Sequence, residues 1–154
     1  SSATIRGRQD IEILPQISGK ITDVKVVEGQ SVVKGQVLFV IDRVPYEAEY
    51  QTAEANYKAA EVSVKSAELT LDSKKKLYNS KVISEYELET AQNGLLSAQA
   101  SLQQAGAQRT SAANNLSYTE VKSPCNGVVG SLPYRAGTLV SSSLSEPLTT
   151  LSDN

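Results

Sequence analysis

Residues 45–78 read PYEAEYQTAEANYKAAEVSVKSAELTLDSKKKLY, and residues 84–116 read SEYELETAQNGLLSAQASLQQAGAQRTSAANNL. In both segments, apolar or small residues recur with steps that alternate between three and four positions. A period of about 3.5 residues, kept over about four heptads in each segment, is typical of coiled-coil helices and not of strands. The sequence therefore predicts two long helices.

The contact positions form one stripe, here called the seam, on each predicted helix. In the first helix the seam comprises Tyr46, Tyr50, Ala53, Tyr57, Ala60, Val64, Ala67, Leu71 and Tyr78. In the second helix it comprises Leu88, Ala91, Leu95, Ala98, Leu102, Ala105, Ala112 and Leu116. One slot on each side is polar, filled by Lys74 and by Arg109. Small alanines at regular intervals predict that the two helices pack closely against each other.

Residues 79–83 between the helices are too few for anything but a tight reversal. Ser84 and Glu87 then follow the Ser-x-x-Glu pattern of a capping box, which satisfies two free amide donors at a helix start. Pro45 suits the first turn of the first helix. We therefore expect an antiparallel helical hairpin over residues 43–116, with arms of about 32 residues and roughly 48 Å.

Two features of the hairpin admit a plain interpretation. The outer face of the first helix carries alternating charges and is expected to be solvated; its charged residues are Glu47, Glu54, Lys58, Glu61, Lys65 and Glu68. Gly94 and Gly106 each cost about 1 kcal/mol relative to alanine in a helix. They indicate either slack in the second arm or contact with a neighbouring protomer.

Composition excludes several classes of function. The chain of 154 residues has a formal net charge of -2 and a sequence pI of about 5.2, whereas nucleic-acid binding requires a basic surface. Histidine, the usual general base near neutral pH, is absent from the sequence. The single Cys125 excludes an internal disulfide and a cysteine cluster for zinc. We therefore expect no enzymatic activity and no bound metal.

On either side of the hairpin, short β-type runs stop at glycines. These runs lie in residues 11–42 and 117–152, and the two segments look like copies of each other. Gly19 and Gly29 are ten positions apart, and so are Gly127 and Gly137. Since neither segment could bury a face alone, the expected fold is α+β. It consists of a small lipoyl-like β-sandwich or barrel of two sequence-distant halves, with the hairpin inserted between them.

The residues of both halves resemble a known family. Residues 15–21, 26–32 and 34–38 are similar to the first half of a biotinyl or lipoyl-type domain, and residues 116–130 are similar to its second half. A lipoyl domain split by a helical hairpin resembles the periplasmic adaptors, or membrane fusion proteins, of tripartite efflux pumps. The run Ser-Tyr-Thr-x-Val-x-Ser-Pro at residues 117–124, followed by Gly-Val-Val, is most similar to adaptors of resistance-nodulation-division transporters.

The resemblance implies a function in drug efflux and antibiotic resistance. Such an adaptor is periplasmic, associates with the inner membrane in its full-length form, and binds an inner-membrane transporter there. It reaches an outer-membrane channel, and it self-associates into a ring, a hexamer in the assembled pump. Full-length members carry a β-barrel domain, so residues 1–10 are expected to be a strand or linker leading toward a β-barrel that this sequence does not contain.

The family docks its channel with an Arg, a Leu four residues later and a Ser seven residues beyond that. Leu77 and Ser84 fit this spacing, whereas Ser73 occupies the Arg position. Lys74 and Lys81 could supply the charge, although a lysine lacks the planar fork of arginine. The resemblance therefore implies a channel-docking tip made of Ser73, Lys74, Leu77, Lys81 and Ser84. The plainer alternative is that these residues only close and cap the end of the hairpin.

A second class of function is a carrier domain of a biotin- or lipoate-dependent enzyme. Carriers hold their modified lysine on the turn that joins the two halves, and here the hairpin takes that place. Lys34 and Lys122 lack the expected setting, so we expect no cofactor. An adaptor of an ATP-driven exporter remains a third possibility. Cys125, in a turn at residues 124–127, is expected to be a tolerated small residue.

Overall fold

The computed structural model describes residues 10–153, which form two compact units. One unit combines residues 10–47 with residues 114–153, and the other comprises residues 48–113. The predicted strand or linker at residues 1–10 lies outside the described residues apart from Asp10. Among the described residues, no helix has both the length and the apolar character that a membrane crossing needs.

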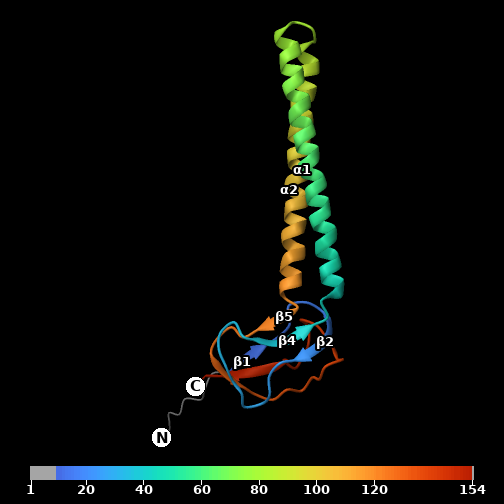
Figure 1. Ribbon diagram of the computed structural model, residues 1–154. Helices are drawn as coiled ribbons and strands as arrows, with labels where there is room; N and C mark the ends of the chain where they lie inside the picture. Colours follow the sequence, from blue (N-terminus) through green and yellow to red (C-terminus); the bar gives the residue numbers. More distant parts are fainter. Residues whose placement is uncertain (1–9, 154) are drawn as a thin grey trace. The chain divides into compact units, whose positions relative to one another are not determined.

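The first unit contains eight short strands in two four-stranded sheets (Figure 1). The strands are β1 (Asp10–Ile13), β2 (Gly19–Val24), β3 (Ser31–Val32), β4 (Val37–Ile41), β5 (Glu120–Lys122), β6 (Gly127–Val129), β7 (Leu139–Val140) and β8 (Thr149–Ser152). One sheet has the order β1-β8-β6-β3 and the other the order β5-β4-β2-β7. All paired strands are antiparallel.

The two sheets are copies of each other, as the sequence repeat predicts. When β1 to β4 are exchanged with β5 to β8 in chain order, the strand order of one sheet becomes that of the other. The matching turns also agree, because Gly29 and Gly137 both adopt positive φ angles, of 86° and 96°. A residue with a Cβ adopts this left-handed conformation only at a cost, which explains glycine at both positions.

The core of this unit is made by both halves of the sequence. Its fully buried apolar side chains include Ile21, Leu38, Phe39, Ile41, Leu148 and Leu151. Each such side chain contributes about 1.5–3 kcal/mol through burial. In each sheet the two central strands come from one half of the sequence and the two edge strands come from the other, so neither half can bury these side chains alone. The predicted α+β fold, with a sandwich of distant halves and an inserted hairpin, is confirmed.

The inserted segment forms α1 (Val44–Asn79) and α2 (Glu85–Ser117), which run antiparallel (Figure 1). The helix start at α1 is helped by Asp42, whose carboxylate accepts a 3.1 Å hydrogen bond from the N–H of Val44. The predicted seam residues are buried or half-buried along both helices, including the polar Lys74 and Arg109. Tyr78 is the exception at 38% exposed, because it lies in the last turn of α1 where the partner helix has ended.

Candidate functional site

The reversal between the helices is held by backbone hydrogen bonds. The N–H of Lys81 donates to the carbonyl of Tyr78, and the N–H of Val82 donates to the carbonyl of Leu77, both at 2.9 Å. Lys81 has a φ angle of 64°. This combination is a Schellman motif, in which a left-handed residue ends a helix and an apolar residue follows it. The motif reverses the direction of the chain within the short connection that the sequence predicts at residues 79–83.

Two apolar side chains are presented at this end of the hairpin. Leu77 is 37% exposed in the last turn of α1, and Val82 is 66% exposed directly after the turn. Tyr86, 77% exposed, adds an aromatic ring in the first turn of α2. Sequence reasoning found Leu77 but missed Val82 and Tyr86. The signal available for Val82 was its place next to the expected turn, where a Schellman motif calls for an apolar residue.

Ser84 caps α2, as predicted. Its hydroxyl accepts a 3.2 Å hydrogen bond from the N–H of Glu87. The carboxylate of Glu87, which a full capping box would turn back toward Ser84, lies 3.6 Å from the ammonium of Lys74. The polar slot of the α1 seam is therefore filled by an ion pair that joins the two helices.

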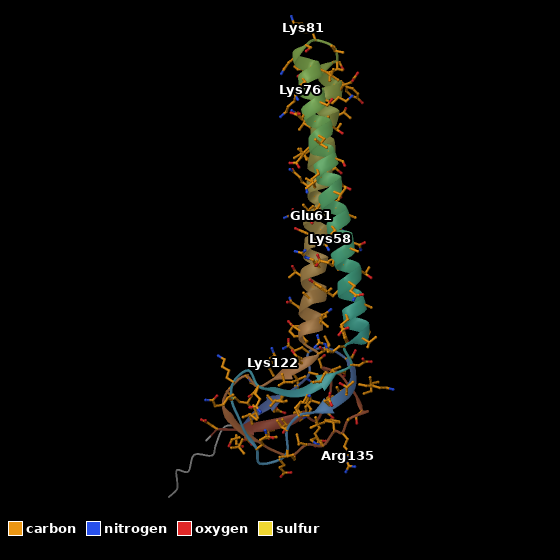
Figure 2. The ribbon with its side chains drawn as sticks, in the orientation of Figure 1. Lys58, Glu61, Lys76, Lys81, Lys122 and Arg135 are labelled. Carbon is orange, nitrogen blue, oxygen red and sulfur yellow. The ribbon has the colours of Figure 1, made fainter. Side chains whose placement is uncertain are left out.

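The lysines at this end differ in how they are engaged. Lys74 is paired with Glu87 across the hairpin, and Lys76 lies 3.3 Å from Asp72 one turn earlier on α1. Among the ion pairs of residues 10–153, Lys75 and Lys81 have no part. Figure 2 shows Lys81 at the very end of the hairpin, pointing away from it. Lys81 is thus the better-placed cation for a partner, and Lys74 mainly holds the helices together.

The remaining predicted tip residue, Ser73, is exposed on α1. It lies one turn before Leu77, and residues four apart share a helix face. Ser73 and Leu77 therefore lie within the last two turns of α1, and the cap Ser84 directly precedes α2, with the lysines around them. Residues 10–153 hold no cluster of three possible metal ligands.

A shallow groove of about 400 Å³ runs beside the tip between the helices. Its lining residues are Ala67, Thr70, Lys74, Tyr86, Glu87, Thr90, Ala91 and Gly94. A methyl group added to Gly94 would meet no atom within 4 Å. The missing side chain of Gly94 is therefore one cause of the groove.

A second polar cluster joins the two helices near the end of the hairpin that lies away from the tip. Arg109 places a guanidinium nitrogen 3.2 Å from a carboxylate oxygen of Glu54 and stacks on the ring of Tyr57, 3.8 Å from its centroid. The hydroxyl of Tyr50 donates a 2.9 Å hydrogen bond to the other oxygen of Glu54. Gly106 leaves room for Tyr57, because a Cβ there would lie 3.3 Å from the ring. The close approach of the Tyr57 ring accounts for a glycine at position 106 without invoking slack in α2 or a contact with a neighbouring protomer.

This cluster shifts two pKa values in opposite directions. The hydrogen bond from Tyr50, aided by the charge of Arg109, holds the pKa of Glu54 below its usual value. The same hydrogen bond and the negative charge of Glu54 raise the pKa of Tyr50. Both shifts favour the charged carboxylate and the neutral phenol, so the cluster keeps one protonation state at neutral pH.

The two lysines considered as attachment points for biotin or lipoate, Lys34 and Lys122, lie in a turn and in a strand of the β unit. Lys34 lies in the turn between β3 and β4, where its backbone N–H donates to the side chain of Asn126 at 2.9 Å. Lys122 is the last residue of β5, an edge strand. The connection between the two halves is the pair α1 and α2 and not a short turn. Cys125 is half-buried and packs against the core.

Known proteins are similar to this chain in sequence and in fold. The profile of the family described as "RND MFP, barrel-sandwich hybrid domain" matches residues 9–152. The multidrug resistance protein MdtE of Escherichia coli K12 is 31% identical over 140 residues, and the multidrug export protein AcrE of the same strain is 33% identical over 140 residues. Each alignment covers 91% of this chain and 36% of the relative.

A solved structure of an adaptor chimera is also similar to this chain. It is a chimera of MacA and MexA that contains the α-hairpin domain of MexA from Pseudomonas aeruginosa. The chimera is 31% identical, has a TM-score of 0.61, and is matched over 94% of this chain and 46% of its own. The chain thus spans about a third to a half of the length of these proteins.

The predicted resemblance is confirmed by a profile match over nearly the whole chain and by relatives above 30% identity. The match includes the two lipoyl-like halves and the hairpin between them. Membership of a family of adaptors also agrees with the expectation that the chain is not an enzyme. The chain belongs to the membrane fusion proteins of resistance-nodulation-division type, the periplasmic adaptor family, and contains their barrel-sandwich hybrid domain.

Proposed function

We propose that the protein is the adaptor of a tripartite drug-efflux pump, linking an inner-membrane transporter to an outer-membrane channel. The observation that carries this proposal is the end of the hairpin. There Leu77 and Val82 are exposed beside a hydrogen-bonded reversal in a chain of the adaptor family. Relatives named for multidrug resistance and multidrug export support the choice of cargo.

The hairpin tip docks the channel through Ser73, Lys74, Leu77, Lys81 and Ser84. Leu77 supplies the apolar contact, and Lys81 supplies a cation that is free of ion pairs among the described residues. Lys74 acts through Glu87 by keeping the last turns of the helices together. Ser84 both caps α2 and faces the partner. With lysine in place of arginine, the contact lacks a bidentate fork and is weaker for each copy.

Weak single contacts are compensated by multiplicity. The full-length protein lies in the periplasm, associates with the inner membrane, and assembles as a ring of six copies. Six tips that engage one channel convert later binding events into intramolecular ones, which raises the overall affinity by orders of magnitude without any new contact. The function depends on hairpin length, stiffness and tip chemistry, and not on catalysis.

The test is a charge placed at the apolar tip of the full-length protein. Leu77→Glu removes the apolar contact and should stop drug export in cells, while the purified variant keeps the helical content and unfolding temperature of the parent. The matched control is Leu96→Glu, which changes a leucine that is also exposed on the hairpin but lies away from the tip. Normal export by Leu77→Glu, or equal loss in both variants, would overturn the tip assignment.

A further inference from the structure

Charge is segregated to one side of α1, whereas α2 carries no charged residue from Thr90 to Gln108. Between Gln51 and Leu77, the charged residues of α1 outside the seam follow steps of three and four along one flank, apart from Lys76. This charged flank comprises Glu54, Lys58, Glu61, Lys65, Glu68, Asp72 and Lys75. Residues spaced in this way share one side of a helix. Figure 2 shows Lys58 and Glu61 side by side on the hairpin.

The opposite flank carries no charged residue between Thr52 and Ser73 of α1 or between Thr90 and Asn115 of α2, and the ion pair Lys74–Glu87 stands at its tip end. This neutral flank comprises Thr52, Asn56, Ala59, Ser63, Ser66, Thr70 and Ser73 of α1 with Thr90, Gly94, Ser97, Ser101, Gln104, Gln108, Ser111 and Asn115 of α2. All of them are exposed except Asn115, which is half-buried. The groove of about 400 Å³ is lined by Thr70 of α1 and Gly94 of α2. The two uncharged rows therefore meet on one flank of the hairpin.

Neither common explanation of an exposed helix face fits the neutral flank. A face in contact with bulk solvent is usually rich in lysine and glutamate, as the charged flank is. The core of a protein interface is enriched in aromatic residues, methionine and arginine, and is depleted in serine and alanine. Away from Lys74, Tyr86 and Glu87 at the tip end, the neutral flank has hydroxyl and amide side chains without charges or aromatic anchors, which is the composition of a wetted surface that attracts neither sign of charge.

We propose that the neutral flank lines the water-filled passage of the tube formed by neighbouring hairpins, along which exported compounds of either charge move. The charged flank then faces away from the passage. This inference rests on the proposed function, because it requires the ring. In a ring, each charge on the inner wall is repeated in every copy, and rings of like charge select permeant molecules by their sign. An uncharged wall avoids that selection.

The test places a charge on each flank of the full-length adaptor at one level of the hairpin. Ser101 of α2 and Glu61 of α1 lie at this level, since the pairs Glu54–Arg109 and Lys74–Glu87 set the register. Export rates of a cationic dye and an anionic dye are measured in cells carrying Ser101→Arg, Ser101→Asp or Glu61→Arg. Ser101→Arg should slow the cationic dye several-fold relative to the anionic dye, and Ser101→Asp should reverse the preference. Glu61→Arg should leave the ratio of cationic-dye export to anionic-dye export as it is in the parent.

Three outcomes would overturn the inference: a dye preference at Glu61→Arg alone, an equal preference at both positions, or none at either. Crosslinking from a cysteine at position 77 to the channel, performed in each variant, reports assembly separately. If that crosslink is absent in the parent, the adaptor proposal itself fails. If it is present and the dye ratios do not change, only the assignment of the flanks fails. Ser97→Arg, one turn from Ser101, repeats the test should Ser101→Arg lose the crosslink.

Discussion

Lys81 holds a backbone conformation that glycine adopts far more readily, with a φ angle of 64°. The left-handed conformation costs a residue with a Cβ roughly 1–2 kcal/mol. The sequence predicts a role for Lys81 from its charge but does not predict its φ angle, because no glycine marks the position. A lysine kept at a glycine position is consistent with a contact made by its ammonium group.

Lys81→Gly should therefore stabilise the fold and weaken docking. We expect the free energy of unfolding to rise by about 0.5–1 kcal/mol, the steric relief reduced by the greater freedom of glycine in the unfolded chain. Lys81→Ala removes the same charge without relieving the backbone, so it should give no such gain. Urea denaturation of both variants checks this, and equal stability of the two would show that the turn is not strained at Lys81.

Glu54 should make stability depend on pH in the acid range. Its pKa is lowered from 4.5 by the hydrogen bond from Tyr50 and by the charge of Arg109. A carboxyl whose pKa is depressed by folding stabilises the protein above its unfolded pKa, and this contribution is lost as the pH falls through the folded value. Glu54→Gln should thus lose less stability below about pH 4.5 than the parent does.

The measurement is the thermal midpoint of unfolding across the acid range. Glu61→Gln is the matched control, because Glu61 lies on the same flank of α1 and has no ion pair among the described residues. The control should follow the parent. A pH dependence of Glu54→Gln that matches the parent as well would show that the cluster around Arg109 does not couple to folding.

At the scale of the elements, the two glycines of α2 differ in their surroundings. A Cβ at Gly94 meets nothing within 4 Å, whereas a Cβ at Gly106 would lie 3.3 Å from Cε1 of Tyr57. Alanine is favoured over glycine in a helix by about 1 kcal/mol. Gly94→Ala should therefore raise the free energy of unfolding by about 1 kcal/mol. Gly106→Ala should gain less, since the Tyr57 ring has to move. Urea unfolding followed by far-ultraviolet circular dichroism compares them; an equal or larger gain at Gly106 would contradict this account.

The helices could be predicted closely because their seam follows from a single period. The residues that form ion pairs with the two polar seam residues could not be predicted. The sequence predicts Lys74 and Arg109 as polar seam positions, but it predicts a capping role for Glu87 and a solvated face for Glu54, and the structure shows that these two carboxylates are their partners. Heptad spacing fixes which residues face the partner helix but not how far a long side chain reaches across the flank. The period also predicts Tyr78 as a seam residue, because it does not indicate where the partner helix ends.

At the scale of the molecule, the two halves of the β unit depend on each other. Phe39 is fully buried in a sheet whose strands come from both halves. Phe39→Ala should lower the free energy of unfolding by about 3–5 kcal/mol. It should weaken both sheets together, giving one transition at a lower urea concentration. Val33→Ala, at an exposed position, should change little. Two separate transitions in Phe39→Ala would contradict a shared core.

The repeat that joins these halves was visible in the sequence because the turns need glycine at Gly29 and Gly137. The spacing of such glycines carries the symmetry that the strand orders then display. The docking partner cannot be predicted in this way, because the surface formed by Leu77 and Lys81 is a binding site only in relation to a second protein. The sequence could therefore predict the fold and the position of the tip, while the contact remains a proposal.

The most direct test of the account is site-specific crosslinking in cells from the hairpin of the full-length protein. Cysteines are introduced at positions 77 and 84 after Cys125→Ser removes the native thiol, with Glu61→Cys as the control midway along the hairpin. We predict that positions 77 and 84 capture an outer-membrane channel protein and that position 61 does not. Capture of the channel from position 61 alone, or from none of the three, would contradict docking through the tip.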